Sequence, residues 1–309
     1  MNTTEIEAAR KALGPVGVCL PVEFTTALDV GAQRDAVRRL ESAGYGAVWT
    51  NEVIGGKDVL VQLAVLLAAT ERMVFGTSIA NIWAREPQTA HGGAALLAQA
   101  YPGRLVLGLG VGYPEQAAGT GREFGRPLAT MRDYVTRMDA QTWPPAPAAD
   151  YPRIIAANGP KMLALAGEIA DGALPAGAPA EQTALARAAL GPDKLLVVGL
   201  SASPDDDDAA RAREAAREQV ARMLDRPGTR ASLAGLGFSE EDVSDVSDRL
   251  VDALIAHGGP AAIAAKVREH LAAGADHVTI LLAPGTEFAT GVDRLEQLAP
   301  ALTEVTRPA

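Results

Sequence analysis

Three carboxylates follow predicted strands at positions where they could take part in acid or base chemistry. Glu23 comes after the first predicted strand, Glu52 after the second and Glu115 after the fourth. Because the carboxyl ends of parallel strands gather at one edge of a sheet, we expect these side chains to face each other there and to act as acids or bases. Glu52 is the first candidate, with Glu23 and Glu115 behind it. The alternative for each is a solvated loop charge.

Two strings of small and polar residues predict a ligand site in the middle of the chain. LVLGLGVGYPEQ (Leu105 to Gln116) has alternating glycines after a buried strand, and glycine lets a backbone approach a ligand closely. The string continues with Tyr-Pro-Glu instead of the helix that a dinucleotide fingerprint opens, so we interpret the glycines as clearance beside a ligand. FGTSIANIW (Phe75 to Trp83) places polar residues at another strand end, which also predicts ligand contacts. Alternatively, Thr77 and Ser78 satisfy local backbone groups.

The elements that must position these residues alternate between short apolar runs and amphipathic stretches of helical length. Each run is continuously hydrophobic, as expected for a strand that is buried on both faces. The eight runs are Val16 to Leu20, Ala47 to Thr50, Val74 to Ala80, Leu105 to Gly110, Arg153 to Ala156, Gly172 to Pro175, Leu195 to Leu200 and His277 to Leu282. The sequence therefore predicts an α/β fold, a single (β/α)8 TIM barrel over residues 1–309.

Two connections are longer than the others. Tyr113 to Gly125 is a glycine-rich loop that follows strand four and so lies at the predicted catalytic mouth. Ser203 to His257 is acidic and rich in arginine, and it predicts a helical insertion after strand seven. We interpret this insertion as solvated, with a lid or a partner surface as the alternative.

Composition excludes several classes of function. The net charge of −10 argues against nonspecific nucleic-acid binding, which depends on Lys and Arg. No apolar run reaches the roughly 18 residues of a membrane span, and the polar N-terminus does not match a signal peptide, so a cytoplasmic protein is expected. The histidines lack ligand spacing and predict no metal site, and the only cysteine, Cys19, lies in an apolar run and predicts a buried filler.

The two strings also resemble a known family. A strand, a proline-led helix, a PGR turn and the LGLGVG strand over Val74 to Gln116 are similar to the bacterial luciferase-like superfamily, and more closely to its oxidoreductases that depend on the deazaflavin coenzyme F420. The resemblance continues in Gly44 to Val53, in Pro152 to Pro175 and more weakly in Gly258 to Ile280. It implies hydride transfer between the deazaflavin and a small organic substrate that the sequence does not identify.

The resemblance further implies which residues line the cofactor ring. Ser78-Ile79 stands where relatives place a nonprolyl cis peptide behind the ring. The other residues at matching positions are Asn51, Asn81, Val111, Gly112 and Glu115. Asn51-Glu52 occupies the place of an Asp-His pair in the sugar-phosphate dehydrogenases of this group, and this difference leaves the acid/base assignment open.

The phosphate end of the cofactor is expected after strands five and six. In ANGPKM (Ala157 to Met162), Asn158 and Gly159 precede a helix that Pro160 opens, and Lys161 adds positive charge, so the helix N-terminus forms an anion site. Gly177 and Ala178 form a second loop of small residues that can pack against the cofactor. The alternative for the first string is an ordinary helix start.

Two other functions remain open from the sequence. An FMN-dependent luciferase-like monooxygenase would use the same barrel, the same strands and the same phosphate end. A barrel that binds flavin without turnover is favoured by the missing Asp-His pair and opposed by the carboxylates at the mouth. In each case the resemblance implies a homodimer, and specificity is expected to reside in the loops.

Overall fold

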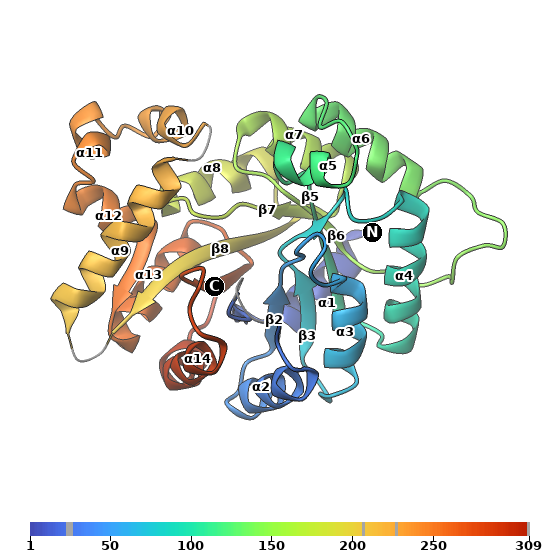
Figure 1. Cartoon of the computed structure of the whole chain (residues 1–309), viewed down its shortest axis with the longest axis horizontal. Helices are drawn as coiled ribbons and strands as arrows, with labels where there is room; N and C mark the ends of the chain where they lie inside the picture. The colour runs from blue at the N-terminus through green and yellow to red at the C-terminus, as the bar shows by residue number, and fades with distance from the viewer. Residues whose placement is uncertain (23–26, 206–207, 226–227, 308–309) are drawn as a thin grey trace.

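The computed structural model describes residues 1–22, 27–205, 208–225 and 228–307, so Glu23 lies outside the described residues. Its parallel strands form a barrel in the order β10-β1-β2-β3-β5-β6-β7-β8, and β8 pairs with β10 to close it (Figure 1). The strands are β1 (Val16–Cys19), β2 (Ala47–Thr50), β3 (Val74–Thr77), β5 (Leu105–Gly110), β6 (Arg153–Ala156), β7 (Gly172–Leu174), β8 (Leu195–Pro204) and β10 (His277–Leu282). The predicted (β/α)8 barrel is confirmed.

One predicted strand is interrupted. The run Val74 to Ala80 forms β3 and then a separate short strand, β4 (Ala80–Asn81), because the chain leaves the sheet at the intervening residues. β3 pairs with the start of β5, and β4 pairs with the end of β5. This interruption places polar side chains at the carboxyl edge of the barrel.

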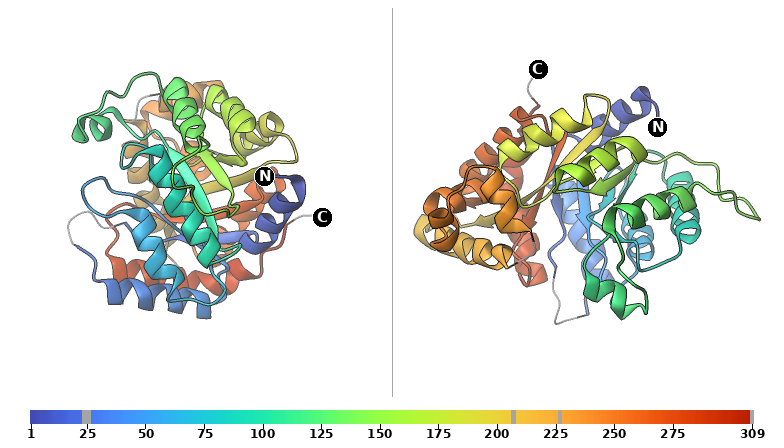
Figure 2. Two further views of the ribbon diagram at one scale, coloured as in Figure 1. Left: turned by 90° about the vertical axis from the view of Figure 1, so that its right-hand side faces the viewer. Right: turned by 90° about the horizontal axis from the view of Figure 1, so that it is seen from above.

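Helices cover the outside of the barrel, as the two further views in Figure 2 show. The helices of the barrel are α2 (Val30–Ser42), α3 (Val59–Leu67), α4 (Pro87–Ala100), α5 (Pro114–Gly119), α6 (Pro127–Met138), α7 (Pro160–Ile169), α8 (Ala180–Leu190), α13 (Pro260–Ala272) and α14 (Phe288–Thr303). An additional helix, α1 (Thr3–Leu13), precedes β1 and buries Ile6 and Leu13 with the residues inside the barrel. The prediction that Tyr113 to Gly125 is a loop is corrected by α5, which Pro114 opens at its first turn.

The helical insertion predicted after the seventh strand of the barrel is present after β8, and it ends in a short strand. It contains α9 (Ala209–Leu224), α10 (Thr229–Gly235), α11 (Glu240–Ser244), α12 (Asp248–Leu254) and then β9 (Ile255–Gly258). β9 pairs in parallel with the last four residues of β8, from Ser201 to Pro204, because β8 runs on beyond the barrel and offers an unpaired edge. The helices of the insertion share a separate apolar cluster that includes Val220, Leu250 and Ile255.

Two apolar layers meet at the barrel wall. The larger cluster lies between the strands and the surrounding helices, and the smaller one fills the barrel interior around Trp49. Inside the barrel, Trp49 Nε1 donates to His277 Nε2 over 3.0 Å, and His277 Nδ1 lies 2.8 Å from the carbonyl oxygen of Gly14. These partners fit a neutral imidazole that carries its proton on Nδ1. Gly76 makes room for Trp49, because a side chain at this position would place its Cβ only 2.2 Å from the Trp49 ring.

Among the described residues, no helix is long and apolar enough to cross a membrane. No group of three or more His, Cys, Asp or Glu side chains in these ranges is arranged to hold a metal ion.

We expect His277 to make stability fall in acid. Burial lowers the pKa of His277 to about 4, whereas the unfolded chain binds the proton near pH 6.5. Unfolding therefore takes up a proton between these values, and the stabilisation is complete above about pH 6.5 and is lost as the pH falls toward 4. At pH 5 the loss from this one site is about 2 kcal/mol.

Urea unfolding of the wild type and of His277→Gln at pH 7.5 and pH 5 checks this expectation. Glutamine retains one acceptor and one donor but does not titrate, so the variant should lose less stability between the two pH values. An equal loss in both proteins would show that other groups cause the acid dependence.

Candidate active site

The site is built on the break between β3 and β4. The peptide bond between Ser78 and Ile79 is cis, as the family resemblance implies. The end of β2 holds both sides of this bond, because Ser78 N donates to the carbonyl of Thr50 over 2.8 Å and Glu52 N donates to the carbonyl of Ile79 over 3.1 Å. Contact of this segment with a cofactor ring stays a prediction.

The glycines of β5 make room for the same break. A Cβ at Gly108 would lie 2.0 Å from the carbonyl oxygen of Thr77, and one at Gly110 would lie 2.6 Å from the Ile79 side chain. Thr77 Oγ1 accepts from Gly108 N over 2.8 Å and donates to Gly108 O over 2.7 Å. Thr77 thus satisfies local backbone groups. The interpretation of Gly108 and Gly110 as clearance beside a ligand is corrected, since the neighbouring strand segment occupies that space.

Gly108→Ala should therefore destabilise the protein by at least about 2 kcal/mol, because the new methyl group meets rigid backbone. Gly92→Ala is the matched control, since Gly92 lies in α4 with no atom within 4 Å of its added Cβ. Helix propensity predicts that this control is neutral or stabilises by up to about 1 kcal/mol. Thermal and urea unfolding of the two variants distinguish these outcomes, and similar values for both would contradict the close-packing explanation.

The outer end of β5 turns at Gly112, which has a φ of 57°. Beside it, Asn81 Nδ2 donates to Gln116 Oε1 over 3.1 Å, and Tyr113 N donates to the same oxygen over 2.9 Å. The structure therefore brings the predicted residues Asn81 and Gly112 together. Sequence reasoning missed Gln116. This residue stands three positions after Tyr113, which precedes α5, and that spacing is the signal of a capping box.

Glu52 is buried, and both of its carboxylate oxygens accept hydrogen bonds. Oε2 accepts from Asn81 N over 2.8 Å, and Oε1 accepts from Val59 N over 3.2 Å. Arg85 forms an ion pair with the same carboxylate, and Arg85 also contacts Asp58 over 2.8 Å. Sequence reasoning missed Arg85, because nothing in the local pattern shows that a residue 33 positions later will reach Glu52.

Glu115 lies in a different environment from Glu52. It is exposed in the first turn of α5, whereas the Glu52 side chain is only 1% exposed. The expectation that the carboxylates gather in one apolar mouth thus does not describe these two side chains. Their acid or base roles stay predictions.

We expect Glu52→Gln to lower the free energy of unfolding by about 3 kcal/mol. The change removes the buried carboxylate that pairs with Arg85 and leaves Arg85 its contact with the more exposed Asp58, and it turns an amide NH2 toward other donors. Glu115→Gln is the control and should change stability by less than about 0.5 kcal/mol. Urea unfolding measures both values. If Glu52→Gln is as stable as the control, the carboxylate does not hold this part of the site together.

Asn51 offers an unsatisfied polar atom at the end of β2. Its Oδ1 is buried and has no hydrogen-bond partner in the part of the chain that the structure describes. Buried polar atoms in proteins are nearly always paired, so an acceptor left open at a strand end is suited to a ligand donor. The structure thus places Asn51, Ser78 and Asn81 at the carboxyl ends of neighbouring strands.

Lys57 and Cys19 lie near the same strand ends. Lys57 Nζ donates to Thr50 Oγ1 over 3.1 Å, and burial lowers the pKa of Lys57 while Cys19 and Glu52 partly oppose that change. Cys19 Sγ lies 3.6 Å from Ser78 Oγ, and burial raises the pKa of the thiol. Cys19 is a buried free cysteine, in agreement with its prediction as a filler.

A separate cavity of about 280 Å³ lies at the ends of β6 and β7. Four residues predicted for the phosphate end line it, namely Asn158, Gly159, Gly177 and Ala178. The fifth, Lys161, is exposed in the first turn of α7 and is not among the lining residues. Asn158 is fixed by bonds from Ala176 N and Gln182 Nε2, each over 2.9 Å.

The insertion supplies the other wall of this cavity. Thr229, Ser232 and Leu233 of α10 line it opposite the loops that follow β6 and β7. Sequence reasoning assigned no site residue to the insertion, since its composition favoured a solvated helical segment over a lid or a partner surface.

Comparison with known proteins agrees with the barrel fold. Residues 15–277 match the model of a family described as luciferase-like monooxygenase. The chain belongs to this family. The description of the family is that of an oxidoreductase, which favours an enzyme over a barrel without turnover.

Two relatives in sequence and one solved structure are informative. A Mycobacterium tuberculosis protein, provisionally named a coenzyme F420-dependent oxidoreductase, is 33% identical over 174 residues, which are 46% of this chain and 50% of that protein. The chain thus spans about half the length of this relative. The 5,10-methylenetetrahydromethanopterin reductase of Methanolobus tindarius is 27% identical, with 77% of this chain and 86% of that protein covered. An F420-dependent secondary alcohol dehydrogenase in complex with an F420-acetone adduct has the same fold, with a TM-score of 0.72, 18% identity, and 94% and 99% of the two chains covered.

Proposed function

We propose that this protein is an F420-dependent oxidoreductase that transfers a hydride between the deazaflavin and a small organic substrate. The observation that carries the proposal is the buried, unpartnered Oδ1 of Asn51 beside the break at Ser78 and Ile79. A deazaflavin ring has an N–H group that can donate to such an acceptor, so the residues present fit the cofactor. When bound, the deazaflavin supplies the hydride chemistry.

The residues of the chain bind and orient the cofactor at two places. Ser78, Ile79, Asn81, Val111 and Gly112 line the ring, with Asn51 as its acceptor. The phosphate end lies in the cavity of Asn158, Gly159, Gly177 and Ala178, while Lys161 contributes positive charge from the first turn of α7. Val111 is held in place because its carbonyl accepts from Trp83 Nε1 over 2.7 Å.

Glu52 acts in this proposal as a positioning residue. Its carboxylate connects the end of β2 to Asn81 of β4 and to the start of α3, so it fixes two residues of the ring site. Glu115, which is exposed on α5, and Glu23 are the remaining candidates for the acid or base that exchanges a proton with the substrate.

The name of the Mycobacterium tuberculosis relative supports F420, and the family description supports the second candidate, an FMN-dependent monooxygenase. The cavity favours F420. Its described lining holds hydroxyls, amides and backbone, and Lys161 acts on it from outside the lining. A site with no Lys or Arg in direct contact suits the single negative charge of a phosphodiester better than the two charges of a terminal phosphate.

Titration of the purified protein with F420 and with FMN in separate experiments tests the proposal. We expect the absorbance and fluorescence of F420 to change on saturable binding, with an affinity at least about tenfold higher than that for FMN. Tighter binding of FMN would favour the monooxygenase, and no binding of either cofactor would contradict both functions.

Asn51→Leu tests the observation on which the proposal rests. Loss of the acceptor should weaken F420 binding by about tenfold, because the ring donor would be buried without a partner. Asn2→Ala at the start of α1 is the control, since Asn2 caps a helix that precedes β1, and it should leave the affinity unchanged. Equal affinities for the two variants would remove Asn51 from the ring site.

A further inference from the structure

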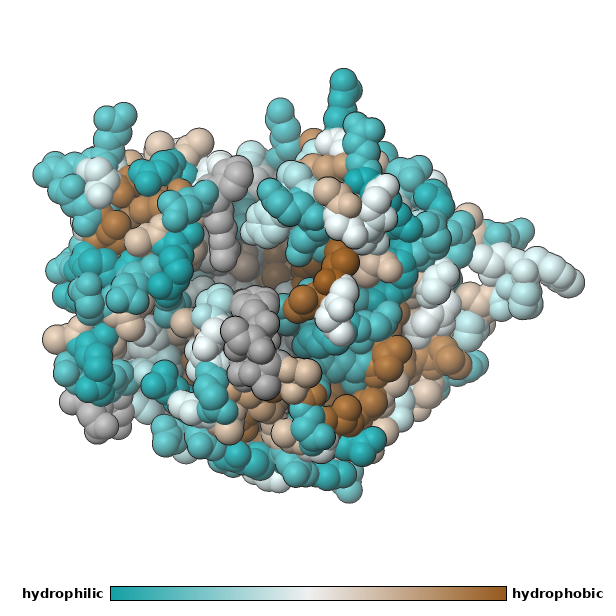
Figure 3. All heavy atoms as spheres, viewed as in Figure 1, coloured by the Kyte–Doolittle hydropathy of each residue, from teal (hydrophilic) through white to brown (hydrophobic). Residues whose placement is uncertain are grey.

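One segment projects from the barrel and carries an exposed tryptophan. Residues 139–152, called the arm below, connect α6 to β6 and extend away from the body in Figure 1 and Figure 2. Trp143 in the arm is 95% exposed, whereas Trp49 and Trp83 are buried. In Figure 3 the arm stands clear of the rest of the surface. Loops of this length without helix or strand are uncommon in compact domains and are usually functional.

An apolar cavity of about 230 Å³ lies at the base of the same arm. It is found at the amino-terminal ends of the strands, opposite the proposed cofactor site, between α1 and the starts of β3 and β5. Its apolar lining includes Ala8, Ala12, Val74, Leu105, Val106 and Pro152. The exposed residues Ala8, Ala12 and Gly103 belong to its wall, so the cavity is open to the surface.

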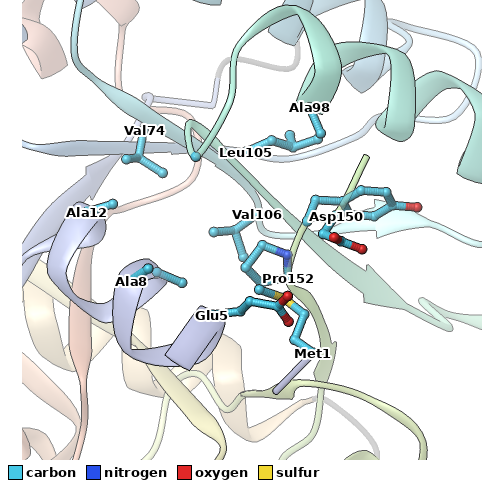
Figure 4. Close-up of a pocket in the computed structure, with 13 residues that line it drawn as sticks. Met1, Glu5, Ala8, Ala12, Val74, Ala98, Leu105, Val106, Asp150 and Pro152 are labelled. Carbon is cyan, nitrogen blue, oxygen red and sulfur yellow. The ribbon is translucent and has the colours of Figure 1, made fainter. Parts of the chain in front are cut away.

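The cavity has the size and the polarity that an indole ring needs. A cavity of about 150 Å³ can hold benzene, so 230 Å³ has room for a larger bicyclic ring. Glu5 and Asp150 also line it, and Figure 4 shows their carboxylates on the side of Pro152, across from Val74 and Ala12. Asp150 has no hydrogen bond or ion pair within the described ranges, so its carboxylate can accept from an indole N–H, which usually finds a partner when it is buried.

We propose that Trp143 of one copy of this chain inserts into the cavity of a second copy, and that the second copy returns the same contact. The chain itself supplies both parts of the contact, Trp143 within the arm and the cavity at the base of the arm. Two arms laid antiparallel about a twofold axis bring each Trp143 to the base of the other arm, so the contact closes in a dimer and does not propagate.

The composition of the arm favours this exchange. Pro144, Pro145 and Pro147 follow Trp143, and proline limits the conformations that a free arm can adopt. Less conformational entropy is then lost when the arm docks. A tryptophan buried in a desolvated pocket is also the residue type that most often dominates the binding energy of an interface.

Sedimentation velocity over a wide range of concentrations tests the proposal. The wild type should form a dimer, and Trp143→Ala should raise its dissociation constant by at least about 30-fold. Ala8→Phe, which fills the cavity from α1, should have the same effect. Leu185→Ala is the control, because Leu185 is a 57% exposed apolar residue on α8, far from the arm in sequence, and it should leave the dissociation constant unchanged.

A disulfide experiment identifies the contact itself. Chains with Trp143→Cys and chains with Ala8→Cys should form a cross-linked dimer after they are mixed and oxidised, and neither variant alone should do so. A monomeric wild type, a dimer that Trp143→Ala leaves intact, or the absence of a mixed cross-link would each overturn the proposal. None of these measurements requires a cofactor. A result that overturns the proposed dimer contact therefore leaves the proposed function untouched, and the reverse also holds.

Discussion

The carboxylate of Glu52 joins the parts of the structure on which the candidate site depends. Its two oxygens reach the backbone of Asn81 in β4, the backbone of Val59 at the start of α3 and the guanidinium of Arg85. The site follows an interrupted strand, where the regular ladder of hydrogen bonds is lost, so another group has to satisfy the freed backbone donors. A buried carboxylate has about four acceptor sites and no donor, which is about twice the acceptor capacity of an amide oxygen or a hydroxyl.

The ion pair of Glu52 and Arg85 contributes more to the specificity of the local conformation than to the free energy of unfolding. Burying Glu52 and Arg85 costs desolvation free energy that their mutual attraction largely offsets, so the pair contributes little net stability compared with apolar residues of the same volume. It nevertheless makes other arrangements costly, because any movement of β4 would leave a charge or a backbone N–H unpaired. Thr77 acts in the same way on the other side of the break through its two bonds to Gly108. The position of Asn81 is therefore fixed by polar contacts on both sides.

The two ends of the barrel are closed by different additions to the fold. At the amino-terminal end, α1 buries Ile6 and Leu13 against the interior and leaves the cavity at the base of the arm. At the other end, the insertion extends β8 with β9 and brings α10 over the loops that follow β6 and β7. The barrel itself thus holds the ring site, while its additions shape the cavity assigned to the phosphate end and the surface assigned to a second copy.

The sequence by itself determined the barrel, because continuous apolar runs separated by amphipathic stretches are compatible with few other architectures. The family resemblance of the sequence implied the break at Ser78 and Ile79, and small residues after predicted strand ends indicated four residues of the cavity at β6 and β7. Only the tertiary structure decided what surrounds them. The ion pair of Glu52 with Arg85, the reason for Gly108 and Gly110, the strand β9 and the cavity wall from α10 all depend on residues that are distant in sequence. Their contacts arise from the closure of the barrel, which a local pattern of hydrophobicity and turn residues does not encode.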